Sequence, residues 1–267
     1  MGKIVAVWGK SGSGKSVLST NLSCALAKRG LKIALIGANR FYGSIQHYFG
    51  MGINPDESLR TCFSEMVYSN IEKYFKACAM QKNLYVSSQS NYDDCLGYSK
   101  FSRDQVKRFL NLSGECFDIM VIECDDSIDD ALSMLSLTHS ELVLYVTRPT
   151  VQHAAFSNGF ESLVKGLSLT DKMQVIVNYD KGYSDIATFL PFGSKHGYTV
   201  LPFCQMIEKS ENNGRPIILS KHPDNPSKTF IGRINDLVDN IVNEGEHLKS
   251  SATKSRIQEG DAIDAVS

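Results

Sequence analysis

Residues 4–28 read I-V-A-V-W-G-K-S-G-S-G-K-S-V-L-S-T-N-L-S-C-A-L-A-K. Ile4–Trp8 is a short apolar run rich in β-branched residues, which predicts a buried strand. A loop of glycine, serine and lysine follows it. From Ser16 to Lys28 the apolar residues recur at helical spacing, and Gly30 ends the predicted helix. The segment therefore predicts a strand, a loop and a helix in direct succession.

The loop Gly9–Ser16 matches the pattern G-x-x-x-x-G-K-[ST], between a buried strand and the first turn of a helix. Its glycines let backbone N–H groups converge on a phosphate, and the helix points its positive end at the same anion. Lys15 is placed to neutralise β- and γ-phosphate charge, and the Ser16 hydroxyl is placed to ligate Mg²⁺. We therefore expect a nucleotide-binding protein with ATP and Mg²⁺ as its ligands.

Further along the chain, apolar runs alternate with helical stretches. Strands are predicted at Lys32–Ile36, Leu84–Ser87, Ile119–Ile122, Leu142–Val146, Val175–Val177 and Tyr198–Leu201. Helices are predicted at Leu59–Met66, Ile71–Met80 and Asp104–Leu112. This alternation predicts one α/β domain over residues 1–242, with a doubly wound, mainly parallel sheet flanked by helices. Residues 243–267 are polar with sparse apolar positions, so we expect a disordered tail there.

Composition narrows the class of protein. With 267 residues the chain can bury one large core, and its formal net charge of -1 gives no general attraction to nucleic acid or anionic lipid. Its seven cysteines include no C-x-x-C pair, which favours reduced thiols in a cytoplasmic protein. No stretch has the pattern of a signal peptide or a membrane span, so we expect no stable membrane insertion. Trp8 is expected in the core.

A second lysine, Lys10, lies inside the loop, and K-S-G-S-G-K-S resembles the deviant Walker A motif K-G-G-x-G-K-[ST] of the ParA/MinD family of positioning ATPases, which includes TadZ-like localisation factors. Ser11 stands where that family usually has glycine. The resemblance extends from Lys3 to about Val242. It is carried by K-I-A-L-I at 32–36, F-D-I-M-V-I-E at 117–123, V-I-V-N at 175–178, L-P-F at 201–203 and E-K-S-E-N-N-G-R-P at 208–216.

The resemblance implies a face-to-face homodimer that forms on ATP binding, with Lys10 reaching the phosphates held by the other subunit. The alternative for Lys10 is an ordinary solvated loop lysine. Asn178 would contact adenine. The implied nucleotide-binding residues are Gly9, Lys10, Ser11, Gly12, Ser13, Gly14, Lys15, Ser16, Val17, Asn178, Pro202 and Phe203. The implied catalytic residues are Lys10, Lys15, Asn39, Glu123 and Asp125, and the metal ligands are Ser16 and Glu123.

Two departures from the family pattern bear on hydrolysis. The family usually has D-x-D after the second strand, where this chain has G-A-N-R at 37–40. Asn39 can orient water but cannot accept its proton, and loss of a positioned base costs roughly 10² to 10⁴ in rate where proton transfer matters. Glu123 replaces the Walker B aspartate, and Asp125 is a candidate substitute. Alternatively Asp125, Asp126, Asp129 and Asp130 begin a helix that runs to Leu137. We expect tight ATP binding and slow hydrolysis.

The sequence leaves the cargo open. Partition of a plasmid or chromosome would need nonspecific DNA binding, for which two basic clusters are candidates: Lys100, Arg103, Lys107 and Arg108, and Arg215, Lys221, Lys228 and Arg233. Localisation of a pilus or secretion machinery would need a protein partner. The candidate protein partners are a pilus-machinery protein and a ParB-like protein. A scaffold with little ATPase activity and a small-molecule phosphotransferase are the alternatives. The tail lacks the amphipathic helix that membrane cycling would require.

Overall fold

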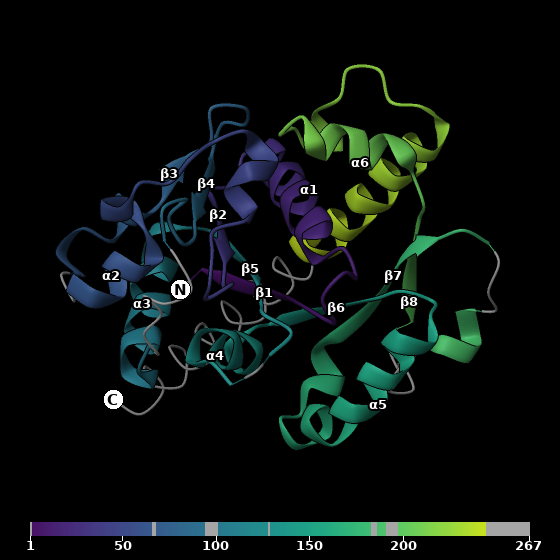
Figure 1. Ribbon diagram of the computed structural model, residues 1–267, viewed down its shortest axis with the longest axis horizontal. Helices are drawn as coiled ribbons and strands as arrows, with labels where there is room; N and C mark the ends of the chain where they lie inside the picture. Colours follow the sequence, from purple (N-terminus) through teal and green to yellow (C-terminus); the bar gives the residue numbers. More distant parts are fainter. Residues whose placement is uncertain are drawn as a thin grey trace, which may run out of the picture.

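The computed structural model describes residues 2–65, 68–93, 101–127, 129–182, 186–190 and 197–243. Within them, eight strands form one sheet in the order β3-β4-β2-β5-β1-β6-β7-β8 (Figure 1). The strands are β1 (Lys3–Trp8), β2 (Ile33–Gly37), β3 (Lys76–Ala77), β4 (Leu84–Ser87), β5 (Ile119–Glu123), β6 (Leu142–Thr147), β7 (Met173–Asp180) and β8 (Tyr198–Pro202). Neighbours pair in parallel except β3 with β4. The predicted mainly parallel sheet is confirmed.

Helices cover both faces of this sheet (Figure 1). One face carries α1 (Lys15–Lys28), α6 (Gln205–Asn212) and a helix over 225–243. The other carries α2 (Leu59–Glu65), α3 (Arg103–Cys116), α4 (Ala131–His139) and α5 (Val151–Gly166). Short 3₁₀ turns include η1 (Ile45–Phe49), η2 (Pro55–Glu57), η3 (Tyr68–Tyr74), η5 (Leu169–Lys172), η6 (Ile186–Phe189) and η7 (Ile217–Leu219). In the part of the chain that is described, none of the helices is both long and apolar enough to cross a membrane.

The sheet separates the core into two layers, and β1 contributes side chains to both of them. Successive side chains of a strand point to opposite faces, so Val5 and Val7 join the cluster around α1 while Ile4 and Trp8 join the cluster on the other face. Trp8 is fully buried and its ring packs edge-on against Tyr145, with ring centroids 5.3 Å apart. Trp8 is therefore a core residue, as expected.

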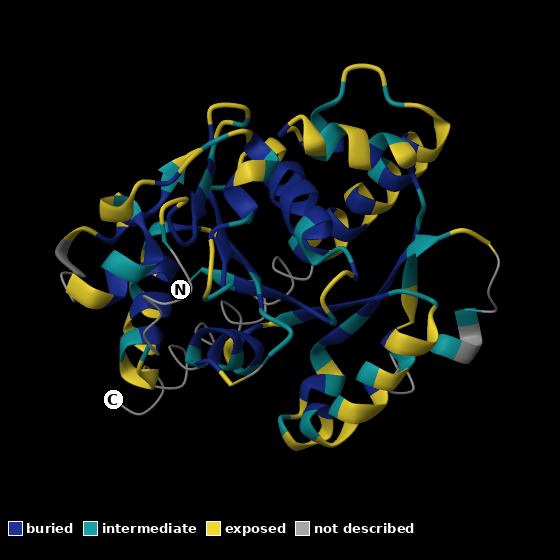
Figure 2. Cartoon of the chain, viewed as in Figure 1, coloured by how far each residue is buried: buried dark blue, intermediate teal, exposed yellow. Residues whose placement is uncertain are grey.

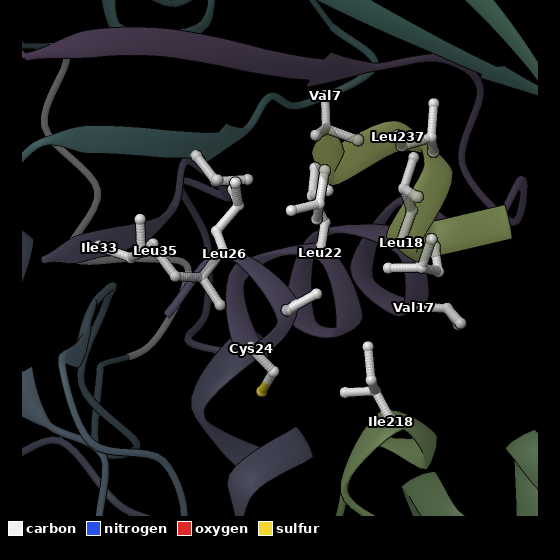
Figure 3. Close-up of a cluster of buried hydrophobic side chains, with 14 of the residues drawn as sticks. Val7, Val17, Leu18, Leu22, Cys24, Leu26, Ile33, Leu35, Ile218 and Leu237 are labelled. Atoms are coloured by element: carbon white, nitrogen blue, oxygen red, sulfur yellow. The ribbon is translucent and has the colours of Figure 1, made fainter. Parts of the chain in front are cut away.

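Helix α1 is buried from Val17 to Ala27, because the sheet covers one side and the helix over 225–243 covers another (Figure 2). Its leucines pack in the cluster that contains Val7 and Leu237 (Figure 3). The buried amide of Asn21 is satisfied at both ends: its Nδ2 donates to the Val17 carbonyl at 2.8 Å and its Oδ1 accepts from the Ile218 amide at 3.0 Å. The first helix of the chain is thus tied to its C-terminal part.

The predicted helix at Ile71–Met80 is wrong. The chain there forms the 3₁₀ turn η3, whose Asn70 has non-helical backbone angles, and then the edge strand β3, which pairs antiparallel with β4. Two tertiary contacts outweigh the local helical pattern. Lys76–Ala77 pairs with β4, which begins seven residues after Ala77, and the Phe75 ring packs against Phe117 with ring centroids 4.6 Å apart.

The other predicted elements agree with the structure to within a few residues. The strand at Leu84–Ser87 and the helix at Asp104–Leu112 are confirmed as β4 and α3, which is longer at both ends. The helix at Leu59–Met66 is confirmed to Glu65, and Met66 lies outside the described residues. The predicted tail over 243–267 lies outside them after residue 243, so its disorder stays a prediction.

Replacing Leu22 by Ala should lower the free energy of unfolding by about 2–5 kcal/mol, because this fully buried side chain fills the space between α1, the sheet and the C-terminal helix. Urea denaturation followed by circular dichroism measures it. The matched control is Val151→Ala on α5, where a 77% exposed side chain should cost about 0.5 kcal/mol or less. Equal effects of the two changes would contradict this packing.

Candidate nucleotide site

A cavity of about 310 Å³ opens at the carboxyl ends of β1, β2, β5 and β7. It is lined by the loop between β1 and α1, by the segment 39–48 after β2 and by residues 123–126 after β5. Tyr179 and Glu211 complete its wall on the side of β7 and α6. Parallel α/β sheets bind their ligands at this edge, where the loops that leave neighbouring strands converge.

The loop between β1 and α1 is built on two glycines that tolerate no side chain. Gly9 has φ 149°, and a Cβ there would lie 2.1 Å from the Val146 carbonyl oxygen. Gly14 has φ 94° and is the N-cap of α1, with no side chain capping the helix there. The first amide groups of α1 therefore remain available to an anion in the cavity. Lys15, the first residue of the helix, folds back so that its Nζ donates to the Gly9 carbonyl at 2.8 Å.

Two side chains, one from β7 and one from the segment after β6, donate hydrogen bonds to carbonyl groups of this loop. Asn178, at the end of β7, donates from Nδ2 to the carbonyl of buried Ser13 at 3.0 Å. Arg148, after β6, donates from Nη1 to the Gly12 carbonyl at 3.2 Å, and its guanidinium carbon lies 4.3 Å from the centre of the Tyr179 ring. These contacts hold the loop through the carbonyl groups of Gly12 and Ser13.

Ser16 and Glu123 form the metal-binding candidate. Parallel pairing of β1 with β5 brings Glu123 level with Val7, just below the loop, and the Ser16 hydroxyl donates to Glu123 Oε1 at 2.6 Å. Burial raises the pKa of Glu123 above its usual value, although Ser16 and the charge of Lys15 work in the opposite direction. Glu123 Oε2 is buried and has no partner among the described residues. An oxygen pair with one unsatisfied carboxylate atom fits a hard divalent cation.

Two acidic residues after β5 have different partners: one caps α4 and the other contacts the phosphate loop. Asp130 is the N-cap of α4 and accepts from the Leu132 and Ser133 amides, which confirms the prediction that it begins that helix. Asp126, by contrast, reaches the phosphate loop and accepts from the Ser11 amide at 3.1 Å. One carboxylate of the chain thus occupies a loop amide that could otherwise bind a phosphate.

Asp125 and Asp126 titrate together. Burial, with the hydrogen bond to Asp126 and its charge, raises the pKa of Asp125 to about 6. Burial also opposes the ionisation of Asp126, but hydrogen bonds from Asp125 and the Ser11 amide and the charge of Lys15 keep the pKa of Asp126 below its usual value. Asp126, which accepts from the Ser11 amide of the loop, is therefore the more acidic of the two.

Asn39 lies in the cavity wall after β2, and its side chain is engaged locally. Its Oδ1 accepts from the amides of Phe41 at 3.0 Å and Tyr42 at 3.3 Å, which stabilises a turn. The next residue, Arg40, forms an ion pair with Asp129 at 2.8 Å. The segment after β2 is thereby joined to the segment after β5.

The predicted residues separate into those that line the cavity and those that do not. Lining it are Ser11, Gly12, Gly14, Lys15, Ser16, Val17, Asn39, Glu123 and Asp125. Outside its lining are Gly9, Lys10, Ser13, Asn178, Pro202 and Phe203. Gly9, Ser13 and Asn178 shape or hold the loop instead, while the Phe203 ring faces Lys181 Nζ at 4.6 Å.

Sequence reasoning missed several lining residues: Tyr42, Ser44, Tyr48, Cys124, Asp126, Tyr179 and Glu211. Asp126 and Tyr179 are adjacent in sequence to predicted residues, so proximity along the chain could have found them. Tyr48 belongs to no motif, whereas Glu211 lies in the segment 208–216 that carries the family resemblance but was not singled out as a site residue. They reach the cavity only because η1 and α6 pack together beside α1.

The two basic clusters lie on different faces of the sheet. Arg103, Lys107 and Arg108 belong to α3, whereas Lys228 and Arg233 belong to the helix over 225–243. Arg233 also pairs with Asp236 at 3.7 Å. Lys100 lies outside the described residues. The clusters therefore do not merge into one basic surface.

Comparison with known proteins identifies the family. The model described as CobQ/CobB/MinD/ParA nucleotide binding domain matches residues 4–217. The chain belongs to this family. This is a nucleotide-binding family, in agreement with the nucleotide binding that the phosphate loop predicts.

Individual members of the family are distant in sequence. The septum site-determining protein MinD of Thermotoga maritima is 25% identical over 234 residues, which cover 82% of each protein. The cell division ATPase MinD of Pyrococcus furiosus has a TM-score of 0.71 at 21% identity, over 90% of this chain and 100% of that one. The MinD of Pyrococcus horikoshii, solved with Mg-ADP, has a TM-score of 0.70 at 18% identity, over 91% and 98%. These structures confirm the fold.

His153, buried in the first turn of α5, should stay neutral in the folded protein until about pH 4, because burial and the charges of Lys10, Arg148 and Lys15 lower its pKa to about 4. Between pH 6.5 and 4 the unfolded chain takes up a proton that the native imidazole does not. This residue should therefore make stability fall as the pH falls, by up to about 1.4 kcal/mol per unit.

Urea denaturation of the wild type and of His153→Gln at pH 7 and pH 5 measures this difference. The variant keeps a polar side chain beside Thr150, whose hydroxyl lies 2.8 Å from His153 Nδ1, and should lose less stability on acidification. An identical pH dependence of the two proteins would contradict the lowered pKa.

Proposed function

We propose that this chain binds Mg·ATP in the cavity, forms a homodimer when ATP is bound, hydrolyses it slowly and through this cycle positions a cellular cargo. The observation that carries the proposal is the uncapped first turn of α1, with Lys15 and Ser16 in it and Glu123 beside it. Membership of a nucleotide-binding family supports it, as does the Mg-ADP complex of the Pyrococcus horikoshii relative.

Ser16 and Glu123 would hold the Mg²⁺. Their oxygens are already adjacent, and the unpartnered Oε2 of Glu123 offers the remaining negative charge. A bound Mg²⁺ would supply positive charge to the β- and γ-phosphates. Lys15 would leave the Gly9 carbonyl, which it contacts here, to pair with the same phosphates.

Lys10 would act on the nucleotide of the other subunit. It belongs to the phosphate loop but does not line the cavity of its own subunit, which is the placement that a role in trans requires. A cation supplied across a dimer interface stabilises charge on the transferred phosphoryl group as an arginine finger does. The dimer would then depend on the γ-phosphate.

Slow hydrolysis follows from the groups around the phosphates. Asn39 cannot take a proton from water, and its Oδ1 is already occupied by two backbone amides. A second candidate function, a nucleotide-binding scaffold with little or no ATPase activity, is favoured by Asp126, whose carboxylate occupies the Ser11 amide. The two candidates differ in whether ATP changes the oligomeric state.

The Lys10→Ala variant tests the proposal through solution mass. Wild-type protein should be monomeric with ADP and dimeric with ATP and Mg²⁺, whereas the variant should bind ATP but stay monomeric, because its own cavity is intact. Light scattering after gel filtration measures the mass. Lys15→Ala should lose nucleotide binding itself. Lys82→Ala, an exposed lysine far along the chain, is the matched control and should dimerise like the wild type.

The same samples distinguish the cargo. Salt-dependent binding of DNA by the ATP dimer alone would favour partition, and no binding would favour a protein partner such as a pilus-machinery or ParB-like protein. A monomer under all conditions, or a dimer indifferent to nucleotide, would contradict the switch and leave the scaffold.

Replacing Asn39 by Asp should raise the rate of ATP hydrolysis about 10-fold or more, because it places a carboxylate in the cavity wall where the wild type has an amide. Phosphate release under single-turnover conditions measures the rate. Asn54→Asp, at the N-cap of η2 where either residue caps well, is the matched control and should leave the rate unchanged. Tight ATP binding with an unchanged rate in Asn39→Asp would count against this account of slow turnover.

A further inference from the structure

Asp126 forms the contact between the segment after β5 and the phosphate loop. Its Oδ2 accepts from the Ser11 amide at 3.1 Å, and its side chain lines the nucleotide cavity. The stretch of sequence that resembles the family in this part of the chain ends at Glu123, three residues earlier. The contact therefore lies outside the motifs that predict the nucleotide site.

The Ser11 amide is available to Asp126 because of the turn that contains it. The Ser13 amide donates to the Lys10 carbonyl at 3.1 Å, which closes a turn of four residues. Gly12 has φ 78°, the left-handed conformation that the third residue of a type II turn adopts. The amide of the second residue takes no part in the hydrogen bond of such a turn. Ser11 therefore offers its N–H to an acceptor outside the turn, and Asp126 is that acceptor.

The Asp126 carboxylate is a charged competitor for this amide. Burial opposes its ionisation, but the hydrogen bonds from Asp125 and from the Ser11 amide, with the charge of Lys15, keep the pKa of Asp126 below its usual value. A hydrogen bond from an amide to an ionised carboxylate is stronger than one between neutral groups. A phosphate that takes the Ser11 amide must therefore displace a strong hydrogen bond and approach a like charge.

The position of Asp126 indicates which phosphate it opposes. The uncapped start of α1 offers its amides to the β-phosphate, and Ser16 with Glu123 would hold the Mg²⁺ that the β- and γ-phosphates share. Asp126 follows Glu123 in the same wall of the cavity, and the amide that it occupies comes three residues before Gly14, the N-cap of α1. We therefore expect the γ-phosphate, rather than the β-phosphate, on the side of Asp126.

We propose that Asp126 opposes the γ-phosphate, so that its contact with the Ser11 amide lowers the affinity of the site for ATP relative to ADP. ADP would leave the contact in place. The γ-phosphate of ATP would compete with the carboxylate for the same N–H and would meet its negative charge. This inference rests on the proposed function, since it requires a nucleotide in the cavity. It makes Asp126 a specificity-determining residue that responds to the third phosphate.

Isothermal titration of Mg·ADP and of a non-hydrolysable Mg·ATP analogue against the wild type, Asp126→Asn and Asp126→Ala tests the inference. Asparagine keeps an acceptor for the Ser11 amide but removes the charge, and alanine removes both. Both variants should bind the ATP analogue about 10-fold more tightly than the wild type, which is the effect of one hydrogen bond to a charged group, and ADP within about 3-fold of it. Asp56→Asn removes an exposed carboxylate outside the cavity lining and should keep the wild-type ratio.

The outcomes separate the two claims. If both Asp126 variants keep the wild-type ratio of the two affinities, the carboxylate does not oppose the γ-phosphate and the proposed function stands. A selective loss of affinity for the ATP analogue would show that Asp126 helps to bind the metal or the γ-phosphate, which also overturns the inference. Failure of the wild type and both variants to bind either nucleotide would overturn both proposals. Circular dichroism of each variant confirms that it is folded.

Discussion

The free amide groups at the start of α1 are the constraint on which the rest of this structure depends. A helix that begins at a glycine with no capping side chain leaves several N–H groups unsatisfied, and the fold must keep them rigid and aimed at one place. Burial of α1 along most of its length achieves this. The buried Asn21, which bonds to the chain at Ile218, adds a polar connection that fixes the helix along its axis.

Charged side chains of both signs lie next to those amides: the carboxylates of Glu123 and Asp126 and the ammonium group of Lys15. Glu123 and Asp126 stand beside the loop, and their carboxylates contact Ser16 and Ser11 directly. A polyphosphate that enters alone would meet these negative charges at short range, which favours entry together with a divalent cation. Lys15 donates to the Gly9 carbonyl inside the loop, and this contact keeps a positive charge next to these carboxylates.

The part of the site that lies close in sequence to the phosphate loop could be predicted. The loop, its flanking strand and helix, and the strand ending at Glu123 follow from local patterns, because each is a short segment whose residues interact with neighbours along the chain. Tyr48 and Glu211 could not be predicted in this way. They meet because Gly214 and Gly50 touch; the segment 208–216 contains Glu211 and Gly214, but it does not indicate that Gly50 is their neighbour.

A further difference has a similar cause. The predicted helix at Ile71–Met80 gives way to an edge strand because β4 pairs with Lys76–Ala77, and a pattern within one segment cannot include its pairing partner. The contact of Asn178 with adenine stays a prediction; in the structure its side-chain amide donates to the Ser13 carbonyl, a tertiary hydrogen bond that the sequence pattern does not determine.

The most direct test of the central claim is a crystal structure of the protein with Mg²⁺ and a non-hydrolysable ATP analogue. We expect the β-phosphate to lie within hydrogen-bonding distance of the amides of Gly14, Lys15 and Ser16, with Lys15 Nζ turned from the Gly9 carbonyl to the phosphates. Phosphates bound elsewhere, with Lys15 still on Gly9, would contradict it.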